Sequence, residues 1–146
     1  MITSRSLDDL LPVVQNMAEQ LIAACTTAGI DLLVTSTYRD LEAQAELYAK
    51  GRGGAPGPIV TNAKPGESYH NWRVALDFCP IEDGKCAWND LAAFERVGVI
   101  AEGLGFEWAG RWTGPLKEEA HVQYTGGLTL AQLEAGQEPA AAPPVA

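Results

Sequence analysis

The chain has 146 residues, a formal net charge of −9 and a hydrophobic content of 47%, which is typical of one globular domain with a buried core. An acidic chain without a cluster of Lys and Arg is poorly suited to the phosphate backbone of nucleic acids, so we expect no nucleic-acid partner. No segment approaches the roughly 18 consecutive apolar residues of a membrane span, so we expect no membrane insertion. A monomer is the default expectation.

The amino-terminal segment, MITSRSLDDLLPVV, has no basic stretch followed by an apolar one. It therefore does not resemble a secretory signal peptide. We expect the protein to be made and folded in the cytoplasm. If it acts outside the cell, another factor must release it.

The first forty residues predict a helix followed by a strand. Apolar residues recur at three- and four-residue steps over 6–28, which indicates a helix. Near its start, Ser6 and Asp9 resemble a capping box, and Pro12 fits either the first turn or a break between a short turn and the main helix. The β-branched, apolar run 31–38 predicts a strand.

The next segment predicts a second helix and a long loop. Asp40 is a suitable N-cap for a helix that ends near Lys50. The following residues, 51–66, are rich in Gly and Pro. A loop of this length is uncommon without a function, so it is either a loop on the substrate side or a tolerated surface insertion.

The rest of the chain completes a mixed set of elements. We predict strands at 73–79, 106–112 and 121–124, and helices at 90–102 and 128–136. Because helices and strands do not alternate regularly, the pattern predicts an α+β domain with a small, mostly antiparallel sheet and helices packed on it. This single domain is expected to span 1–136, and the Ala- and Pro-rich tail 137–146 to be disordered.

The three cysteines carry different predictions. Cys25 falls on an apolar helical stripe and is interpreted as a small core residue. Cys79 and Cys86 flank the turn-like segment CPIEDGKC. They can pair as a disulfide across a hairpin or bind a metal, but in a cytoplasmic protein two free thiols are the favoured interpretation.

The two histidines of the chain, His70 and His121, are the candidates for metal chemistry. Together with Asp77 they make two imidazoles and a carboxylate, a standard ligand set for catalytic zinc. Metal-bound water can attack at neutral pH, and a nearby carboxylate such as Glu118 can take its proton. Spacing alone also permits an interpretation without metal, in which His70 lies in a turn, His121 lies at a strand end and Asp77 is a paired or capping residue.

The position of Asp77 favours the metal interpretation. It lies between Leu76 and Phe78 in an apolar segment, where a carboxylate is costly to bury unless it is paired or bound to metal. In an unbroken strand His70 would lie more than about 20 Å away from it. If both residues bind one ion, the chain must turn between them, around 71–73.

At this point a family resemblance becomes specific. The segment SYHNWRVALDF resembles the Ser-x-His-x-x-Gly-x-Ala-x-Asp signature of the M15 zinc peptidases, which include D-alanyl-D-alanine carboxypeptidases, dipeptidases and L-alanyl-D-glutamate endopeptidases. Four positions match: Ser68, His70, Ala75 and Asp77. Arg73 stands where the signature has glycine, which puts close backbone packing there in question.

Two further segments extend the resemblance over about 30–136. STYRDLEAQAELY is similar to the family's Ser-x-x-Arg…Gln…Leu-Tyr segment, with Ser36, Arg39, Gln44 and Tyr48 in register. FEWAGRW followed by EEAHVQY is similar to the phage-endolysin branch. Differences from that branch fall at Ala109, Arg111, Glu118, Ala120 and Val122.

The resemblance implies a role for each principal residue. His70, Asp77 and His121 would hold one zinc ion in a cleft. Glu118 would act as general base and then as acid; Glu119 is the rival, but in an extended segment it points the other way. Arg39 would offer its guanidinium to the scissile carbonyl or to a substrate carboxylate.

Supporting roles are less specific. Gln44 is interpreted as ordering Arg39 or the adjacent loop, and Ser68 either bonds a ligand or forms a turn. Further residues assigned to substrate binding or ligand support are Ser36, Trp72 and Trp108. Trp72, Trp108 and Trp112 can each wall the cleft or belong to the core.

The resemblance implies a peptidoglycan stem peptide as substrate. The phage-like features favour a zinc-dependent L-alanyl-D-glutamate endopeptidase that reaches the cell wall through a separate membrane pore. The alternatives are a D-alanyl-D-alanine carboxypeptidase or dipeptidase, and a non-catalytic, zinc-stabilised binding domain. A zinc knuckle on Cys79 and Cys86 is disfavoured because their loop contains no histidine.

Overall fold

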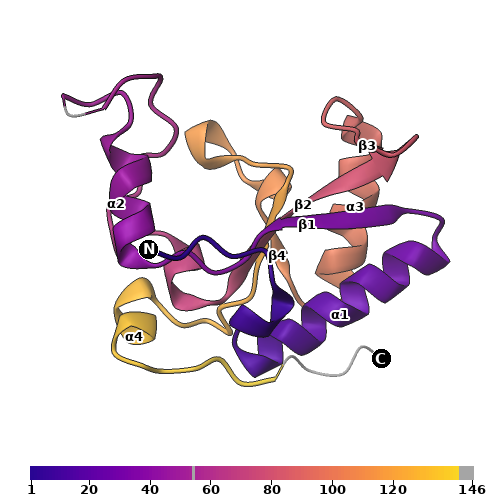
Figure 1. Ribbon diagram of the computed structural model, residues 1–146. Helices are drawn as coiled ribbons and strands as arrows, with labels where there is room; N and C mark the ends of the chain where they lie inside the picture. The colour runs from indigo at the N-terminus through magenta and orange to yellow at the C-terminus, as the bar shows by residue number, and fades with distance from the viewer. Residues whose placement is uncertain (54, 142–146) are drawn as a thin grey trace.

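An antiparallel sheet forms the centre of the molecule (Figure 1). The computed structural model describes residues 1–53 and 55–141. The strand order is β1-β2-β5-β4, and β3 pairs with β2. The strands are β1 (Asp31–Ser36), β2 (Ala75–Glu82), β3 (Lys85–Cys86), β4 (Glu107–Trp108) and β5 (His121–Gln123). The predicted α+β class with an antiparallel sheet is confirmed.

In the described residues, four α-helices and four 3-10 helices surround this sheet. The α-helices are α1 (Pro12–Thr27), α2 (Leu41–Ala49), α3 (Leu91–Gly103) and α4 (Leu130–Glu134). The 3-10 helices are η1 (Leu7–Asp9), η2 (Tyr69–Trp72), η3 (Ala109–Arg111) and η4 (Gly114–Leu116). In the described part of the chain, no helix is both long and apolar enough to cross a membrane.

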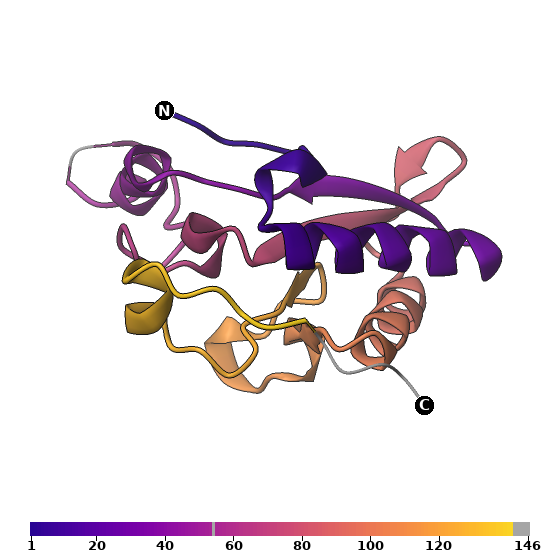
Figure 2. The same cartoon turned by 90° about the horizontal axis from the view of Figure 1, so that it is seen from below.

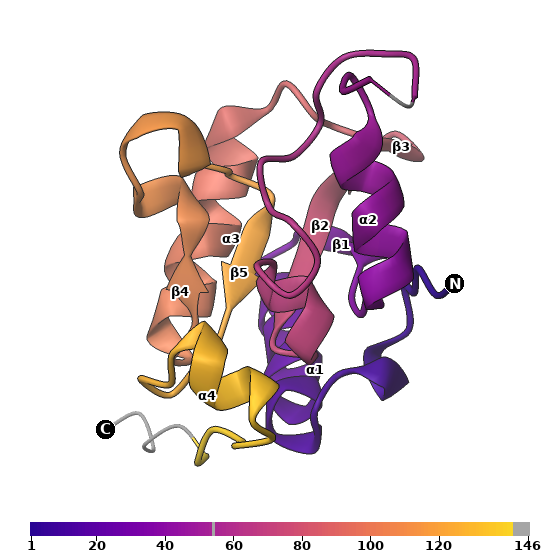
Figure 3. The ribbon, with the colours of Figure 1, turned by 90° about the vertical axis from the view of Figure 1, so that its left-hand side faces the viewer.

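The core lies between the sheet and helices α1 and α3. From below, α1 runs alongside β1 and β2, with α3 next to its carboxyl end (Figure 2). The central strand β2 contributes Leu76 and Phe78, both fully buried, and Phe78 packs against Phe94 of α3. Cys25 is buried on α1, as predicted. On the opposite side lie α2, η2 and the segment 109–118 (Figure 3). Residues of these three segments line a cleft.

The predicted helix over 6–28 is interrupted. Leu11 is extended (φ −58°, ψ 146°), and Pro12 is the first residue of α1, because a residue before proline disfavours the helical conformation. The proline therefore marks a break, as one of the two alternatives predicted. The capping box is not formed: the Ser6 hydroxyl accepts the Asp8 N–H of η1, while Asp9 accepts the hydroxyl of Ser4.

The other helix starts agree with the sequence. Asp40 and Asp90 are the N-caps of α2 and α3, and Thr129 caps α4 within a complete capping box. In each case the side-chain oxygen accepts a backbone N–H three residues on, which satisfies a helix donor that would otherwise lack a partner.

Strand β2 continues beyond the predicted end at residue 79. It turns at Asp83 and Gly84, both with positive φ (53° and 76°), the conformation that suits a two-residue Asp-Gly hairpin. The hairpin brings Cys86 to 5.7 Å from Cys79, Cα to Cα, and the two form a disulfide. The prediction of two free thiols is therefore wrong, because strand pairing rather than compartment decides their proximity.

The predicted strand 106–112 is also shorter than expected. Only Glu107 and Trp108 pair with β5, and the chain then enters η3. The Trp108 indole occupies the space beside Gly98 and Gly110, where an added Cβ would lie 2.2 Å from the ring. Strand β4 ends at Trp108, and η3 then folds back so that Gly110 lies against the Trp108 ring.

Arg73 explains the glycine of the signature motif. Its φ is 64°, the left-handed conformation that glycine adopts most easily. The guanidinium lies 3.7 Å from the centre of the Tyr38 ring and donates a hydrogen bond to the Asp9 carbonyl at 2.9 Å. The position needs a positive φ rather than close packing, and these contacts offset the conformational cost in a residue with a side chain.

The two ends of the chain contact the domain. The segment 2–4 runs beside 37–40: Ser4 donates to the Tyr38 carbonyl, and Thr37 donates to the Ser4 carbonyl. Of the predicted disordered tail, 142–146 lie outside the described residues. Within the described part, Pro139 is buried and the Tyr124 hydroxyl donates to the Ala140 carbonyl.

Candidate metal centre and cleft

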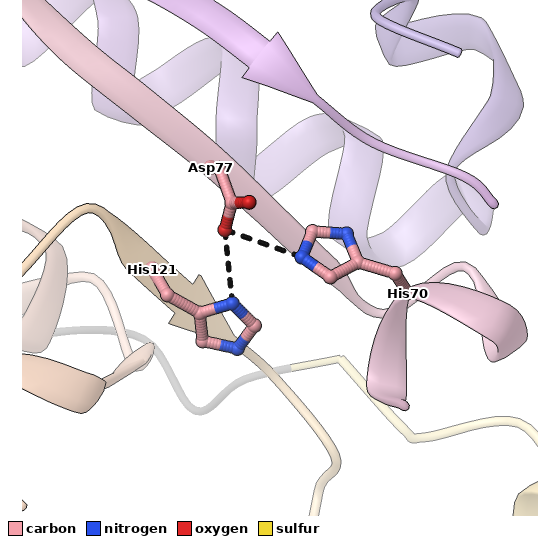
Figure 4. A group of neighbouring side chains, drawn as sticks. All are labelled: His70, Asp77 and His121. Atoms are coloured by element: carbon pink, nitrogen blue, oxygen red, sulfur yellow. Dashed lines mark hydrogen bonds and ion pairs between the residues drawn. The ribbon is translucent and has the colours of Figure 1, made fainter. Parts of the chain in front are cut away.

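His70, Asp77 and His121 converge in the cleft (Figure 4). One potential ligand atom from each lies within 4.8 Å of the other two. Asp77 comes from the middle sheet strand β2, and His121 lies directly opposite it on β5. His70 comes from η2, and the chain reverses through Arg73 before entering β2, so the turn predicted around 71–73 is confirmed.

Each imidazole has one nitrogen facing Asp77 and the other held by a hydrogen bond. His70 Nε2 and His121 Nδ1 lie 3.2 Å and 3.0 Å from Asp77 Oδ1. On the far side, His70 Nδ1 bonds the Thr37 carbonyl at 2.7 Å, and His121 Nε2 bonds Gln123 Oε1 at 2.8 Å. Two oriented imidazoles and a carboxylate with open space beside them fit a catalytic zinc ion.

The electrostatics of this cluster favour charge separation. Burial would raise the pKa of Asp77, but hydrogen bonds from His121 and His70 outweigh it and hold the pKa well below its usual range. Burial would likewise lower the pKa of His121, but the hydrogen bond and charge of Asp77 raise it. Without metal, a proton on the His121 imidazole therefore balances the buried carboxylate.

Glu118 lies in the same cleft, which has a volume of 610 Å³. Desolvation inside the cleft, followed by repulsion from Asp77, raises the pKa of Glu118. A carboxylate with a raised pKa beside a candidate metal site is suited to exchange protons. Glu119 does not line the cleft, and its carbonyl accepts the Trp108 indole N–H at 2.9 Å.

Arg39 also lines the cleft, and its guanidinium is held by a hydrogen bond to Gln44. Its Nη1 donates to Gln44 Oε1 at 3.0 Å, and the Gln44 amide donates to the Ala63 carbonyl at 2.8 Å. Gln44 is fully buried and so links Arg39 to the long loop. Burial lowers the pKa of Arg39, and its buried Nε has no hydrogen-bond partner among the described residues.

The two serines have different positions. Ser68 begins η2 as the N-cap: its hydroxyl accepts the His70 N–H, and Asn71 completes the capping box. Ser68 thus supports a ligand through the backbone. Ser36 pairs with Asp77 across β1 and β2, and its buried hydroxyl has no partner within the part of the chain that the structure describes.

The tryptophans divide between core and cleft. Trp108 is 5% exposed and belongs to the core, and Trp72 donates its indole N–H to the Gly66 carbonyl. Neither lines the cleft, so a direct contact with substrate is not supported for either. Trp112 does line it, with its ring centre 6.0 Å from that of His121. The sequence did not distinguish the three, because an indole suits either the core or the wall of a cleft.

Two cleft residues, Gln123 and Glu107, were missed by motif comparison. Gln123 is two residues after His121 on β5, and its side chain therefore projects from the same face. Glu107 pairs with Gln123 across β4 and β5. The period-two pattern of the strand was the signal that could have identified Gln123.

Comparison with known proteins now decides the family. A family model described as VanY, D-alanyl-D-alanine carboxypeptidase, matches residues 8–127. The chain belongs to the VanY family. The resemblance to M15 zinc peptidases is thereby confirmed.

Relatives of this VanY-family chain include two peptidoglycan peptidases. It is 42% identical over 124 residues to the peptidoglycan L-alanyl-D-glutamate endopeptidase CwlK of Bacillus subtilis strain 168, covering 79% of this chain and 73% of that protein. It is 28% identical over 126 residues to the L-alanyl-D-glutamate peptidase of a Listeria phage. That match covers 83% of this chain but 41% of the phage protein.

Solved structures show the same fold. The L-Ala D-Glu endopeptidase ChiX of Serratia marcescens superimposes with a TM-score of 0.61 at 21% identity, covering 85% of this chain and 89% of that one. A mutant of the vancomycin resistance D,D-pentapeptidase VanY, in complex with Zn(II), gives 0.61 at 19% identity, covering 86% and 83%. At these identities the likeness establishes the VanY fold.

Proposed function

We propose that this protein is a zinc-dependent peptidase that cleaves the L-Ala–D-Glu bond of the peptidoglycan stem peptide. The observation that carries the proposal is the cleft that joins the His70–Asp77–His121 cluster to Glu118 and Arg39. A site that only stabilised the fold would need neither an acidic residue with a raised pKa nor a guanidinium that lines the cleft.

In this proposal His70, Asp77 and His121 hold the zinc ion. When bound, zinc polarises the scissile carbonyl and lowers the pKa of a bound water. Glu118 takes the proton of the attacking water and returns it to the leaving amine, because its raised pKa suits both directions of transfer. The open cleft leaves space beside the cluster for the peptide.

Arg39 is proposed to bind the oxygen on which negative charge develops, or a carboxylate of the substrate. Gln44 holds one of its terminal nitrogens, so the guanidinium is oriented before the substrate arrives. Donors fixed in advance stabilise the transition state without a reorganisation cost. Trp112 provides an apolar wall on the His121 side.

The choice of bond rests on relatives. CwlK, at 42% identity, is named an L-alanyl-D-glutamate endopeptidase, whereas the family description names a D-alanyl-D-alanine carboxypeptidase. Digestion of purified peptidoglycan, with mass spectrometry of the products, separates the two. New D-Glu amino termini support the endopeptidase, and released D-Ala would replace it by the carboxypeptidase. Zinc binding without either product would support the non-catalytic alternative.

Action outside the cytoplasm is part of the proposal, since peptidoglycan lies there. The Cys79–Cys86 disulfide agrees with this location, because disulfides persist in oxidising surroundings. Release through a separate pore is tested by expressing the protein with and without a pore-forming partner. Lysis that needs no pore would contradict this route.

A further inference from the structure

His121 is the first member of a hydrogen-bonded row that continues away from the candidate metal site. Its Nε2 lies 2.8 Å from Gln123 Oε1, and Gln123 Nε2 donates to Glu107 Oε2 at 3.2 Å. Gln123 is 2% exposed, so water does not substitute for these partners. Strand pairing fixes the row, because Glu107 is the cross-strand partner of Gln123.

The glutamine in this row needs its neighbour. An amide side chain has an accepting oxygen and a donating nitrogen of nearly equal shape, so Gln123 alone could present either end to His121. A carboxylate only accepts hydrogen bonds. Glu107 therefore draws the Gln123 nitrogen to its own side, and the Gln123 oxygen is left facing the imidazole.

The orientation of Gln123 then determines which nitrogen of His121 carries a proton. A neutral imidazole has one N–H and one lone pair. Since Gln123 Oε1 can only accept, Nε2 keeps its proton when His121 is neutral. The lone pair is then on Nδ1, the atom that faces Asp77 and that donates to it only while His121 is doubly protonated. We propose that Gln123 and Glu107 are positioning residues that hold His121 in the form able to bind metal through Nδ1.

The other histidine shows why a side-chain pair is needed here. His70 Nδ1 bonds the backbone carbonyl of Thr37 at 2.7 Å. A carbonyl cannot exchange donor for acceptor, so the orientation of His70 needs no further residue. Of the two histidines, only His121 bonds a side-chain amide, Gln123, whose oxygen and nitrogen could exchange places. Glu107 contacts this amide.

The inference rests on the proposed zinc site but not on the choice of substrate. The first test is the zinc dissociation constant, measured by competition with a chromophoric chelator. Gln123→Leu keeps the side-chain size and the charge but removes the acceptor, and should weaken zinc binding about 10- to 100-fold, as is usual for lost outer partners of a ligand. Glu107→Gln should weaken it less, because an amide at 107 can still accept. Glu134→Gln, an exposed change on α4, is the control.

The decisive variant exchanges the two groups. In Glu107→Gln/Gln123→Glu, the carboxylate accepts from His121 and the amide donates to the carboxylate, with the same net charge as the parent. It should recover most of the affinity lost in Gln123→Leu. Equal zinc binding by parent and Gln123→Leu, or no recovery in the exchanged variant, would overturn the inference. A parent that bound no zinc would overturn the proposed function and this inference together.

A spectroscopic readout separates positioning from packing. With two histidines in the chain, the imidazole ¹⁵N signals of the zinc-loaded protein can be assigned directly. The parent and the exchanged variant should show a protected Nε2–H on His121, which Gln123→Leu should lose. The Nδ1–H of His70 should stay unchanged as an internal reference. A His121 proton on Nδ1 in the loaded parent would refute the assignment.

Discussion

Asp77 and His121 face each other as a registered pair across β2 and β5, with Asp77 Oδ1 and His121 Nδ1 3.0 Å apart. Two of the three candidate ligands are therefore placed by sheet hydrogen bonds rather than by loops. Sites built on strands keep their geometry better than sites built on loops. The third ligand, His70, is tied to β1 by its bond to the carbonyl of Thr37, the residue after that strand.

Removing the proposed general base, Glu118, should leave zinc binding intact and abolish peptidoglycan cleavage. Glu118→Ala is expected to bind zinc as the parent does and to lose peptidoglycan cleavage by a factor of about 10² or more, the usual contribution of a general base. His121→Ala should lose both. Zinc content and product release measure the two effects. Glu119→Ala is the matched control, and an active Glu118→Ala would reject the base assignment.

Zinc should stabilise the protein more as the pH rises. The pKa of His121 is raised, so the stability from its ion pair with Asp77 is present at low pH and is lost as the pH rises through that pKa. Zinc needs deprotonated imidazoles. As the pH rises above about 6.5, the ordinary pKa of histidine, the melting temperature of chelator-treated protein should fall while the gain on adding zinc grows. A gain independent of pH would contradict imidazole ligation.

Arg73 offers a test of the left-handed turn. Arg73→Ala keeps the conformational cost and loses the contacts with Tyr38 and Asp9, so the free energy of unfolding should fall by about 1–2 kcal/mol. Arg73→Gly loses the same contacts but recovers about 1 kcal/mol of strain. Glycine should therefore be the more stable of the two in denaturant titrations. The reverse order would show that packing, not φ, matters here.

The space beside Trp108 should tolerate no added methyl group. Gly98→Ala places a Cβ 2.2 Å from the indole and should lower the free energy of unfolding by about 1–3 kcal/mol. Gly103→Ala on the same helix meets no atom within 4 Å and should be neutral or stabilising by up to about 1 kcal/mol. Thermal unfolding compares the two; equal effects would mean that Trp108 is not fixed in the core.

Reducing the disulfide should loosen the β2–β3 hairpin. A bridge that closes such a short loop contributes about 2 kcal/mol by restricting the unfolded chain. Unfolding in urea, with and without a mild reductant, should show a loss of that size. Alkylation of Cys25 is excluded under native conditions because it is fully buried. An unchanged midpoint with both Cys79 and Cys86 reduced would contradict a stabilising role.

The sequence predicted the elements well where local rules decide them. Asp40 caps the helix it was expected to cap, because a side-chain oxygen and a nearby N–H suffice. The geometric requirement for a turn between His70 and Asp77 also followed from strand rise alone. The family resemblance pointed to Arg39 and Glu118, and both residues line the cleft.

Features that depend on distant pairing were not predictable in the same way. The pairing of Cys79 with Cys86 requires the register of β2 and β3, and the burial of Trp108 requires two glycines on other elements. Gln123 and Glu107 lie 16 residues apart and meet only because β4 and β5 pair. Spacing in one strand cannot show such contacts.

The segment 2–4 has a practical consequence for handling the protein. The Thr37 N–H donates a hydrogen bond to the Ser4 carbonyl, and the Thr37 carbonyl bonds His70 Nδ1. One residue, Thr37, thus separates Ser4 from a candidate zinc ligand. A purification tag or truncation that displaces residues 2–4 would reach the metal centre through Thr37, whereas an addition after residue 146 begins at the opposite end of the chain. Proteins tagged at one end or the other should therefore differ in zinc content before they differ in folding.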